Sequence, residues 1–168
     1  HKPLPPRTRT NHSHALTPAH TEPMSGQLGS LAAPLTGVTV VKGTTDVSTF
    51  NNGTVYVVEY WATWCPPCRS SVPHLSELQN KYRDQGVVFI GISNEPKDKV
   101  EKFAKDMGDQ MNYVVAADPD RTTKGYMEAF EIRGIPHAFL VSKEGKIVWH
   151  GHPMDPAFEK AIVQELKA

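Results

Sequence analysis

The sequence predicts an α/β fold in which helices cover both faces of one mixed β-sheet. Apolar runs typical of buried strands alternate with stretches of helical periodicity along most of the chain. The segment Lys143-Glu144-Gly145 then separates two short β-rich runs, which is typical of a hairpin turn. The 168 residues are enough for one domain and too few for two comfortable ones. We therefore expect a single three-layer sandwich with the sheet in the middle.

The first predicted elements are two strands and a long helix. Residues 38–41 form a short β-rich run, and residues 54–60 form a nearly continuous apolar run. A continuous rather than alternating pattern is typical of a central strand that is buried on both faces. The helix is expected over residues 66–82, and Gly86 ends it. Its inward face is formed by Val72, Leu75, Leu78 and Tyr82.

The rest of the chain continues the alternation of strands and helices. The expected elements are a strand at 87–92, a helix at 97–107, a strand at 113–116, a helix at 122–130, strands at 138–141 and 146–149, and a helix at 156–167. The helix at 97–107 has the clearest periodicity, because apolar side chains recur at i, i+3, i+4 and i+7. These side chains are Val100, Phe103, Ala104 and Met107.

The N-terminal segment differs in composition from the rest. Residues 1–23 hold five of the 14 prolines and four of the eight histidines. Such a segment buries too little apolar area to offset its ordering entropy, so we expect a flexible tail over residues 1–30 and a domain over residues 31–168. Three origins are open: a transit-like leader, a linker from a longer precursor, or extraneous residues before a natural start at Met24. We favour the last, which predicts a cytoplasmic protein, whereas a cleaved leader would reverse that expectation.

The charge balance excludes two classes of partner. Lys plus Arg number 18 and Asp plus Glu number 18, so the formal net charge is zero. General binders of nucleic acids or of membrane surfaces carry a basic excess. The sequence also lacks an apolar run of about 18 residues, the length that a transmembrane helix needs. We expect no nucleic-acid partner, no membrane span and a monomeric protein.

The two cysteines, Cys65 and Cys68, lie where the predicted central strand passes into the long helix. One pair does not make the disulfide framework of a small secreted fold, and structural zinc usually needs four ligands. The sequence holds no second CxxC pair. We expect no resident metal and no cofactor.

This position gives the cysteine pair a specific chemistry. Cys65 lies at or before the helix N-terminus, where the helix dipole and free amide groups favour its thiolate. Cys68 lies one turn further along the same face. Cys65 would attack a substrate disulfide and Cys68 would resolve the mixed disulfide, or the reverse cycle would oxidise a dithiol. Because Pro66 and Pro67 offer no N–H groups, we expect the pKa of Cys65 to be lowered only moderately.

Other interpretations of these residues stay open. The two cysteines are either chance neighbours in a core turn or ligands of a soft metal ion together with His74 or His137. The His150-x-His152 pair is a second possible chelate, although surface histidines are the ordinary case.

The residues around the cysteines resemble a known family. Residues 59–68 read EYWATWCPPC, which is similar to the active-site segment of the thioredoxin superfamily, and above all to its TlpA/ResA-like (redoxin) thiol–disulfide oxidoreductases. Three further features match this family: Pro73 within the helix, the Gly134-Ile135-Pro136 loop, and the hairpin over residues 139–149. A CxxC pair with a matching proline about 70 residues later is a strong signal.

The resemblance covers roughly residues 38–167 and implies a thioredoxin-like three-layer sandwich. The additional strand–helix unit over residues 94–130 is similar to the TlpA-type insertion. The family pattern also implies that Pro136 is cis and faces the disulfide, and that the backbone of Ile135 pairs with an extended substrate strand. The implied substrate-binding residues are Trp64, Pro66, Pro67, Ile135 and Pro136. His137 departs from the Thr often found after that proline, and it either tunes Cys65 or is an inert hydrogen-bonded histidine.

Glu59 is unexpected within the apolar run of the central strand, because burying a carboxylate is costly. In thioredoxin, the corresponding position holds a buried aspartate that exchanges protons with the second cysteine. The resemblance therefore implies that Glu59 accepts the proton of Cys68 during resolution. The alternative is an acid on an edge strand that faces solvent.

The sequence thus predicts a protein dithiol–disulfide oxidoreductase that works with protein substrates and a partner reductase. One alternative is a metal-binding or redox-inert interaction protein with the same fold. Another is a peroxiredoxin-like peroxidase, which residues 118–120 resemble. Such peroxidases carry a PxxxTxxC arrangement, whereas Thr63 stands two residues before Cys65 rather than three. The motif leaves the direction of exchange open, since direction depends on the redox potential of the compartment.

Overall fold

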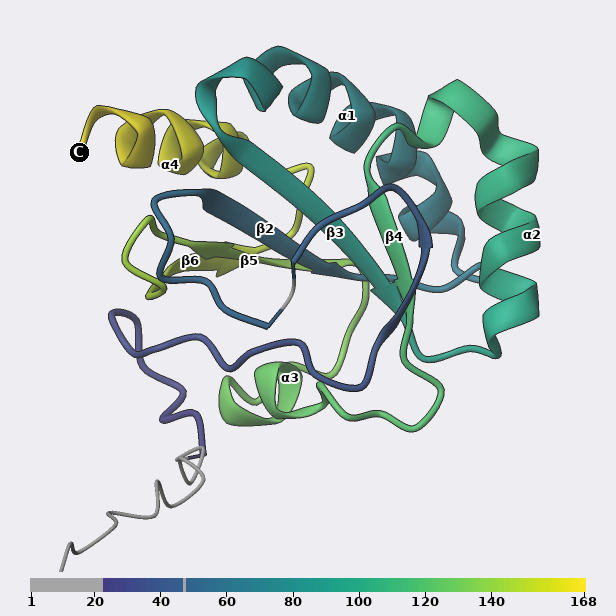
Figure 1. Cartoon of the computed structure of the whole chain (residues 1–168), viewed down its shortest axis with the longest axis horizontal. Coiled ribbons are helices and arrows are strands. Elements are labelled where there is room, and N and C mark those ends of the chain that lie inside the picture. The colour runs from purple at the N-terminus through teal and green to yellow at the C-terminus, as the bar shows by residue number, and fades with distance from the viewer. Residues whose placement is uncertain (1–22, 47) are drawn as a thin grey trace, which may run out of the picture.

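The computed structural model describes residues 23–46 and 48–168. Six strands form one mixed sheet in the order β1-β4-β3-β2-β5-β6 (Figure 1). The strands are β1 (Thr39–Lys42), β2 (Val55–Tyr60), β3 (Val87–Ser93), β4 (Val114–Ala117), β5 (His137–Val141) and β6 (Ile147–Gly151). The helices are α1 (Pro66–Tyr82), α2 (Lys97–Met107), α3 (Gly125–Ala129) and α4 (Pro156–Lys167). The predicted α/β fold with a mixed sheet is confirmed.

Strand β2 lies in the interior of the sheet because its side chains are apolar on both faces. Residues 55–58 are all buried, and they alternate between the two apolar clusters of the protein. β2 pairs with β3 in parallel and with β5 in antiparallel orientation. In this register Glu59 lies opposite Gly91 on β3 and Ala138 on β5. The one acid of the strand is therefore held within the sheet and not at its edge.

Two apolar clusters give the fold its three layers. One cluster packs α1, α2 and α4 against the face of the sheet that carries Val57 and Trp61. The other cluster packs α3 and the N-terminal residues Leu35 and Phe50 against the opposite face. Figure 1 shows α1, α2 and α4 on one side of the sheet and α3 on the other. The layer on the face opposite α1, α2 and α4 therefore consists of one short helix and irregular chain.

Helix α1 begins and ends at residues suited to those positions. Pro66 and Pro67 occupy its first turn, where a missing N–H costs nothing because the first N–H groups have no partner in the helix. Pro73 lies inside the helix and removes one backbone hydrogen bond there. A single 3-10 turn, Arg83–Gln85, follows and ends at Gly86, whose φ of 83° favours glycine. The helix predicted over residues 66–82 is thus confirmed.

The helix expected over residues 122–130 is shorter in the structure, where α3 spans only Gly125–Ala129. Asp118 accounts for the difference. Its carboxylate accepts hydrogen bonds from the backbone N–H groups and hydroxyls of Thr122 and Thr123, at 2.7 to 2.9 Å. These four bonds stabilise a turn over residues 122–124, where the first turn of the helix was expected. Aspartate and threonine favour such turns because their side chains form hydrogen bonds with nearby backbone groups.

The end of the expected N-terminal tail is hydrogen-bonded to β6. The N–H of Gly29 donates to the carbonyl of Ile147 at 2.7 Å, and the N–H of Ile147 donates to the carbonyl of Ser30 at 2.9 Å. Residues 1–22 of the same expected tail lie outside the described residues. Among the helices of the described ranges, none has the length and apolar character needed to cross a membrane.

Candidate active site

Cys65 and Cys68 form a disulfide at the junction between β2 and α1. Cys65 is the N-cap residue of α1, and its backbone is extended with φ of −90° and ψ of 108°. The N–H of Cys68 donates to Cys65 Sγ at 3.3 Å, so the first sulfur takes the place of a capping oxygen. The helix dipole and this N–H both favour negative charge on Cys65 when the disulfide opens.

The loop before β5 covers the first sulfur. The Ile135–Pro136 peptide bond is cis. The carbonyl oxygen of Ile135 lies 3.8 Å from Cys65 Sγ, and Pro136 is buried. Residues separated by about 70 positions along the chain are therefore brought together around one reactive atom.

The approach to the disulfide is lined by exposed side chains. Trp64 is 68% exposed, although large aromatic side chains are usually buried. Pro66 and Pro67 are exposed as well, whereas Cys65 and Cys68 are buried at 3% and 0% exposure. The exposed surface next to the buried disulfide is therefore formed by Trp64 and the two prolines.

Glu59 is buried near the end of β2, at 2% exposure. Its side chain follows the same alternation as Val57 and Trp61, which belong to the apolar cluster that contains Cys68. Neither carboxylate oxygen has a hydrogen-bond partner among the described residues. Burial away from water disfavours the charged form and raises the pKa of Glu59 to about 8. The pKa of Glu59 therefore lies near that of an ordinary thiol and well above that of a carboxyl group at the surface.

Gly91 is paired with Glu59 across β2 and β3, and two buried aromatic residues lie against Gly91. Trp61 Nε1 and the Tyr113 hydroxyl are also buried without a hydrogen-bond partner in the described part of the chain. The pKa of Tyr113 is raised by burial and further by the nearby Glu59 carboxylate. A Cβ on Gly91 would lie 3.1 Å from Trp61 Nε1 and 3.1 Å from Tyr113 Cε2. The absent side chain of Gly91 therefore makes room for the two rings beside Glu59.

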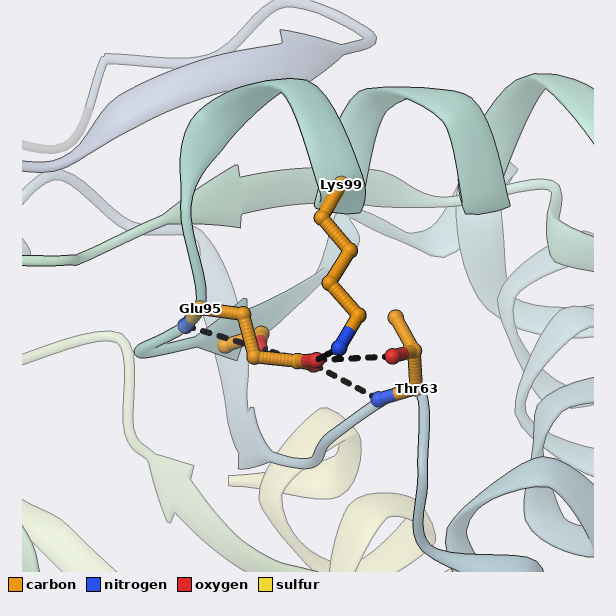
Figure 2. A network of polar contacts seen from close by, with 4 residues as sticks. Thr63, Glu95 and Lys99 are labelled. Carbon is orange, nitrogen blue, oxygen red and sulfur yellow. Dashed lines mark hydrogen bonds and ion pairs between the residues drawn. The ribbon is translucent and has the colours of Figure 1, made fainter.

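Glu95 holds the loop that leads into Cys65 (Figure 2). One carboxylate oxygen of Glu95 accepts hydrogen bonds from the N–H of Thr63 at 2.7 Å and the hydroxyl of Ser93 at 2.8 Å. The other accepts from the Thr63 hydroxyl at 2.7 Å and pairs with Lys99 Nζ at 3.0 Å. Burial alone would raise the pKa of Glu95, but the hydrogen bonds from Thr63, Lys99 and Ser93 together lower it. Glu95 is therefore ionised at neutral pH and joins the segment before Cys65 to the end of β3.

His137, directly after the cis proline, is paired with a second histidine. Its Nε2 lies 2.9 Å from Nδ1 of His150 on β6. Burial, and after it the proximity of His150 and His152, lowers the pKa of His137 to about 4. His137 is therefore neutral at neutral pH and contributes no positive charge to Cys65. In residues 23–46 and 48–168, no group of three or more His, Cys, Asp or Glu side chains is placed to hold a metal ion.

Comparison with known proteins agrees with this geometry. The model of the AhpC/TSA family matches residues 28–150. The chain belongs to the AhpC/TSA family. A curated relative, the thiol–disulfide oxidoreductase ResA of Bacillus subtilis, is 32% identical over 92 residues, which cover 54% of this chain and 49% of that protein. The chain thus spans about half the length of the curated relatives that it matches.

Solved structures place the chain on the thioredoxin-like side of the AhpC/TSA family. The thioredoxin domain of a thiol–disulfide oxidoreductase from Bacteroides vulgatus is 26% identical, with a TM-score of 0.69 over 83% of this chain and 98% of that one. A thiol:disulfide interchange protein from Bacteroides sp. is 25% identical, with a TM-score of 0.69 over 86% and 93% of the two chains. The predicted thioredoxin-like, ResA-like fold is confirmed.

The AhpC/TSA family name also covers peroxidases, but Thr63 is not arranged for that chemistry. A peroxidatic threonine stands three residues before its cysteine and serves that cysteine, as the PxxxTxxC pattern requires. Thr63 is two residues before Cys65, and its hydroxyl donates to Glu95 instead. The site therefore favours disulfide exchange over peroxide reduction.

The structure brings most of the predicted site residues of this AhpC/TSA protein together. Cys65, Cys68, Trp64, Ile135 and Pro136 meet at the end of β2. Glu95 was not predicted as a site residue, because an acid just after a strand is typical of an exposed turn. The signal that was available is that Glu95 directly precedes Pro96 and the helix α2, so its loop is short and constrained. Tyr113 was not predicted either, because its position near Glu59 depends on the pairing of β3 with β4.

Replacing Glu95 with Ala should destabilise the protein by about 2–4 kcal/mol, because it leaves the half-buried Thr63 N–H and the buried Ser93 hydroxyl without their acceptor. Urea unfolding of the oxidised protein measures this change. Lys99→Gln is the matched control, since Lys99 is 56% exposed and its ion pair is worth at most about 1 kcal/mol. Equal losses in the two variants would contradict the role assigned to the Thr63 contact.

Proposed function

We propose that this chain exchanges disulfides and dithiols with protein substrates, with Cys65 as the nucleophile and Cys68 as the resolving cysteine. One observation carries the proposal: the Cys65–Cys68 disulfide closes on the N-cap of α1, with Cys65 Sγ beside the carbonyl of Ile135. When this disulfide opens, the helix N-terminus stabilises the thiolate of Cys65, and the Ile135–Pro136 loop lies beside that sulfur, where a substrate chain would bind.

The reductive cycle begins with the reduced pair. The thiolate of Cys65, stabilised by the Cys68 N–H, attacks one sulfur of the substrate disulfide, and the other substrate sulfur leaves as a thiolate that takes a proton from solvent. In molecules in which Glu59 is ionised, a fraction that grows as the pH approaches its pKa of about 8, Cys68 then loses its proton to the Glu59 carboxylate and attacks Cys65 Sγ. This second step forms the intramolecular disulfide and releases the remaining substrate sulfur as a thiolate, which takes a proton from solvent, while Glu59 returns its proton to solvent. Two electrons pass to the substrate, and the reverse sequence oxidises a substrate dithiol.

A buried carboxyl group suits the second step better than an exposed one. Cys68 is fully buried, so its thiol cannot give its proton directly to solvent. The raised pKa of Glu59, about 8, lies close to that of an ordinary thiol, so proton transfer between the two groups costs little free energy. The relatives named above, a ResA thiol–disulfide oxidoreductase and a thiol:disulfide interchange protein, support the same assignment. A partner reductase, a monomeric state and a cytoplasmic location stay predictions.

Reduction of insulin tests this proposal. The wild-type protein, with dithiothreitol as the terminal reductant, should precipitate the insulin B chain well before dithiothreitol alone does. Cys65→Ser should fall to the rate of dithiothreitol alone, because no thiolate remains to attack. Cys68→Ser should still attack but should accumulate a mixed disulfide with insulin, visible on a non-reducing gel. Insulin reduction that persists in Cys65→Ser would overturn the mechanism.

A further inference from the structure

A pocket of about 340 Å³ opens directly beside the disulfide. On the disulfide side it is bounded by Trp64, which precedes Cys65, and by Ile135, whose carbonyl contacts Cys65 Sγ. On the far side it is bounded by Met127 and Ile132, from α3 and the segment that follows it. A chain joined to Cys65 by a disulfide therefore has this pocket within reach of its next few residues, since an extended residue spans about 3.3 Å.

The rim of this pocket carries three cationic side chains, Arg121, Lys124 and Arg133. All three are exposed, and none forms an ion pair with an Asp or Glu of the described residues. Two acids also line the pocket. Asp118 is buried with both oxygens occupied by Thr122 and Thr123, whereas Glu128 is exposed.

This local excess of positive charge contrasts with the rest of the domain. Residues 24–168 contain 15 Lys and Arg against 17 Asp and Glu, so the domain as a whole is slightly acidic. The three cations are brought to one pocket by two separate segments, one around the Asp118 turn and one leading into the cis proline. Because three cations outnumber two acids at this pocket, and one of those acids is buried, the pocket attracts a negatively charged ligand segment and speeds its association.

The Asp118 turn holds the first two cations in a defined place. The N–H of Arg121 donates to the carbonyl of Asp118 at 3.0 Å, and the N–H of Lys124 donates to the carbonyl of Arg121 at 3.2 Å. Arg121 has a φ of 56°, in the left-handed region that residues other than glycine rarely adopt. Non-glycine residues in that region cluster at functional sites, where surrounding contacts hold them in place. Arg121 and Lys124 therefore belong to a turn whose backbone is held by hydrogen bonds.

We propose that this pocket binds the segment of a substrate protein that flanks its reactive cysteine, and that it selects segments carrying carboxylates. The proposal rests on the disulfide-exchange function above and names its substrate class: acidic cysteine-containing segments with an apolar side chain beside them. The apolar side chain lies against Trp64, Met127 and Ile132, and the carboxylates meet the three cations. Selection then acts on the rate at which a substrate disulfide meets Cys65, not on the chemistry at the sulfur.

Three short disulfide-bonded peptides test the substrate class. They share one sequence with an apolar residue next to the cysteine and differ only in whether the flanking residues are Glu, Gln or Lys. The quenching of Trp fluorescence reports the oxidation of the dithiothreitol-reduced, desalted protein in a stopped-flow instrument. Each second-order rate constant is divided by the rate of the same peptide with free dithiothreitol, which removes differences in intrinsic disulfide reactivity.

The wild-type protein should oxidise about tenfold faster with the Glu peptide than with the Gln peptide, and slowest with the Lys peptide. At about 1 M salt, where charges are screened beyond ~3 Å, the three rates should come within about twofold of one another. The triple variant Arg121→Gln, Lys124→Gln, Arg133→Gln should show the same convergence at low salt. Lys105→Gln is the matched control, because Lys105 is an exposed cation on α2 without an ion pair among the described residues, and it should keep the wild-type preference.

The outcomes test the acidic substrate class and the exchange activity separately. Normalised rates that are equal for the three peptides, or a preference that survives in the triple variant, would overturn the acidic substrate class and leave the exchange activity standing. Absence of reaction with every peptide, together with absence of insulin reduction, would overturn the exchange function itself. If the triple variant does not fold, the salt dependence of the wild-type protein still decides the question, since a preference unaffected by salt is not electrostatic.

Discussion

Replacing Glu59 with Gln is expected to slow the attack of Cys68 on the mixed disulfide by about 10²- to 10³-fold, the usual size of a general-base contribution. The attack of Cys65 on the substrate should change by less than about threefold. The difference arises because Gln fills the same space but cannot accept the proton of Cys68. The first thiolate, in contrast, is stabilised by the Cys68 N–H and the helix terminus, which the substitution leaves in place.

Single-turnover experiments separate the two steps. Reduced protein is mixed with a peptide disulfide, quenched with acid at intervals, and the mixed disulfide is followed by mass spectrometry. Glu59→Gln should accumulate the mixed disulfide, whereas the wild-type protein should pass through it too quickly for it to build up. Glu101→Gln, an exposed acid on α2, is the control and should behave as wild type. Equal slowing of both steps in Glu59→Gln would remove Glu59 from the role of proton acceptor.

The same carboxyl group should make the oxidised protein lose stability as the pH rises from about 4.5 to 8. In the unfolded chain Glu59 ionises near its ordinary pKa of 4.5, whereas in the folded protein burial raises the pKa to about 8. Between these values the folded state binds more protons than the unfolded state, so the free energy of unfolding falls with increasing pH. Above pH 8 both states are ionised, and this contribution stops changing.

The size of this effect follows from the shift in pKa. A shift from 4.5 to about 8 corresponds to about 5 kcal/mol at 1.36 kcal/mol per pH unit, accumulated over the whole interval. Urea unfolding of wild type and Glu59→Gln at several pH values measures it, because the difference between the two curves isolates the carboxyl group. The difference should grow by several kcal/mol between pH 5 and pH 8. Parallel curves would show that Glu59 ionises in the folded protein as it does in water, and a carbon-13 NMR titration of the wild-type carboxyl group checks the same pKa directly.

The features that the sequence predicted are those in which local pattern and tertiary environment agree. The run over residues 54–60 is apolar on both faces, and the structure buries it between two neighbours in the sheet. The helix over residues 66–82 has one apolar face and a proline-rich start, and α1 has these bounds. The cysteine pair and the Ile135–Pro136 loop were recognisable because both carry a motif of their own.

The features that the sequence did not predict depend on contacts between distant segments. Glu95 becomes a buried acceptor only because the loop before Cys65 comes within 2.7 Å of it. The helix expected from residue 122 gives way to a turn because Asp118 offers better partners to two threonines than the helix does. Arg121 and Arg133 belong to one pocket only after β5 has paired with β2. The periodicity of a sequence does not reveal such contacts, since it reflects only the order of residues along the chain.

Gly91, which lies opposite Glu59 on β3, limits the substitutions that this part of the sheet can accept. Burial raises the pKa of Glu59, and the rings of Trp61 and Tyr113 lie against the space that Gly91 leaves empty. A methyl group at Gly91 would lie 3.1 Å from atoms of both rings, so the rings would have to shift by a few tenths of an ångström. The packing of Trp61 and Tyr113 near Glu59 therefore depends on Gly91, a residue of β3 that has no side chain. A redesign of this part of β2 therefore has to leave position 91 on β3 without a side chain.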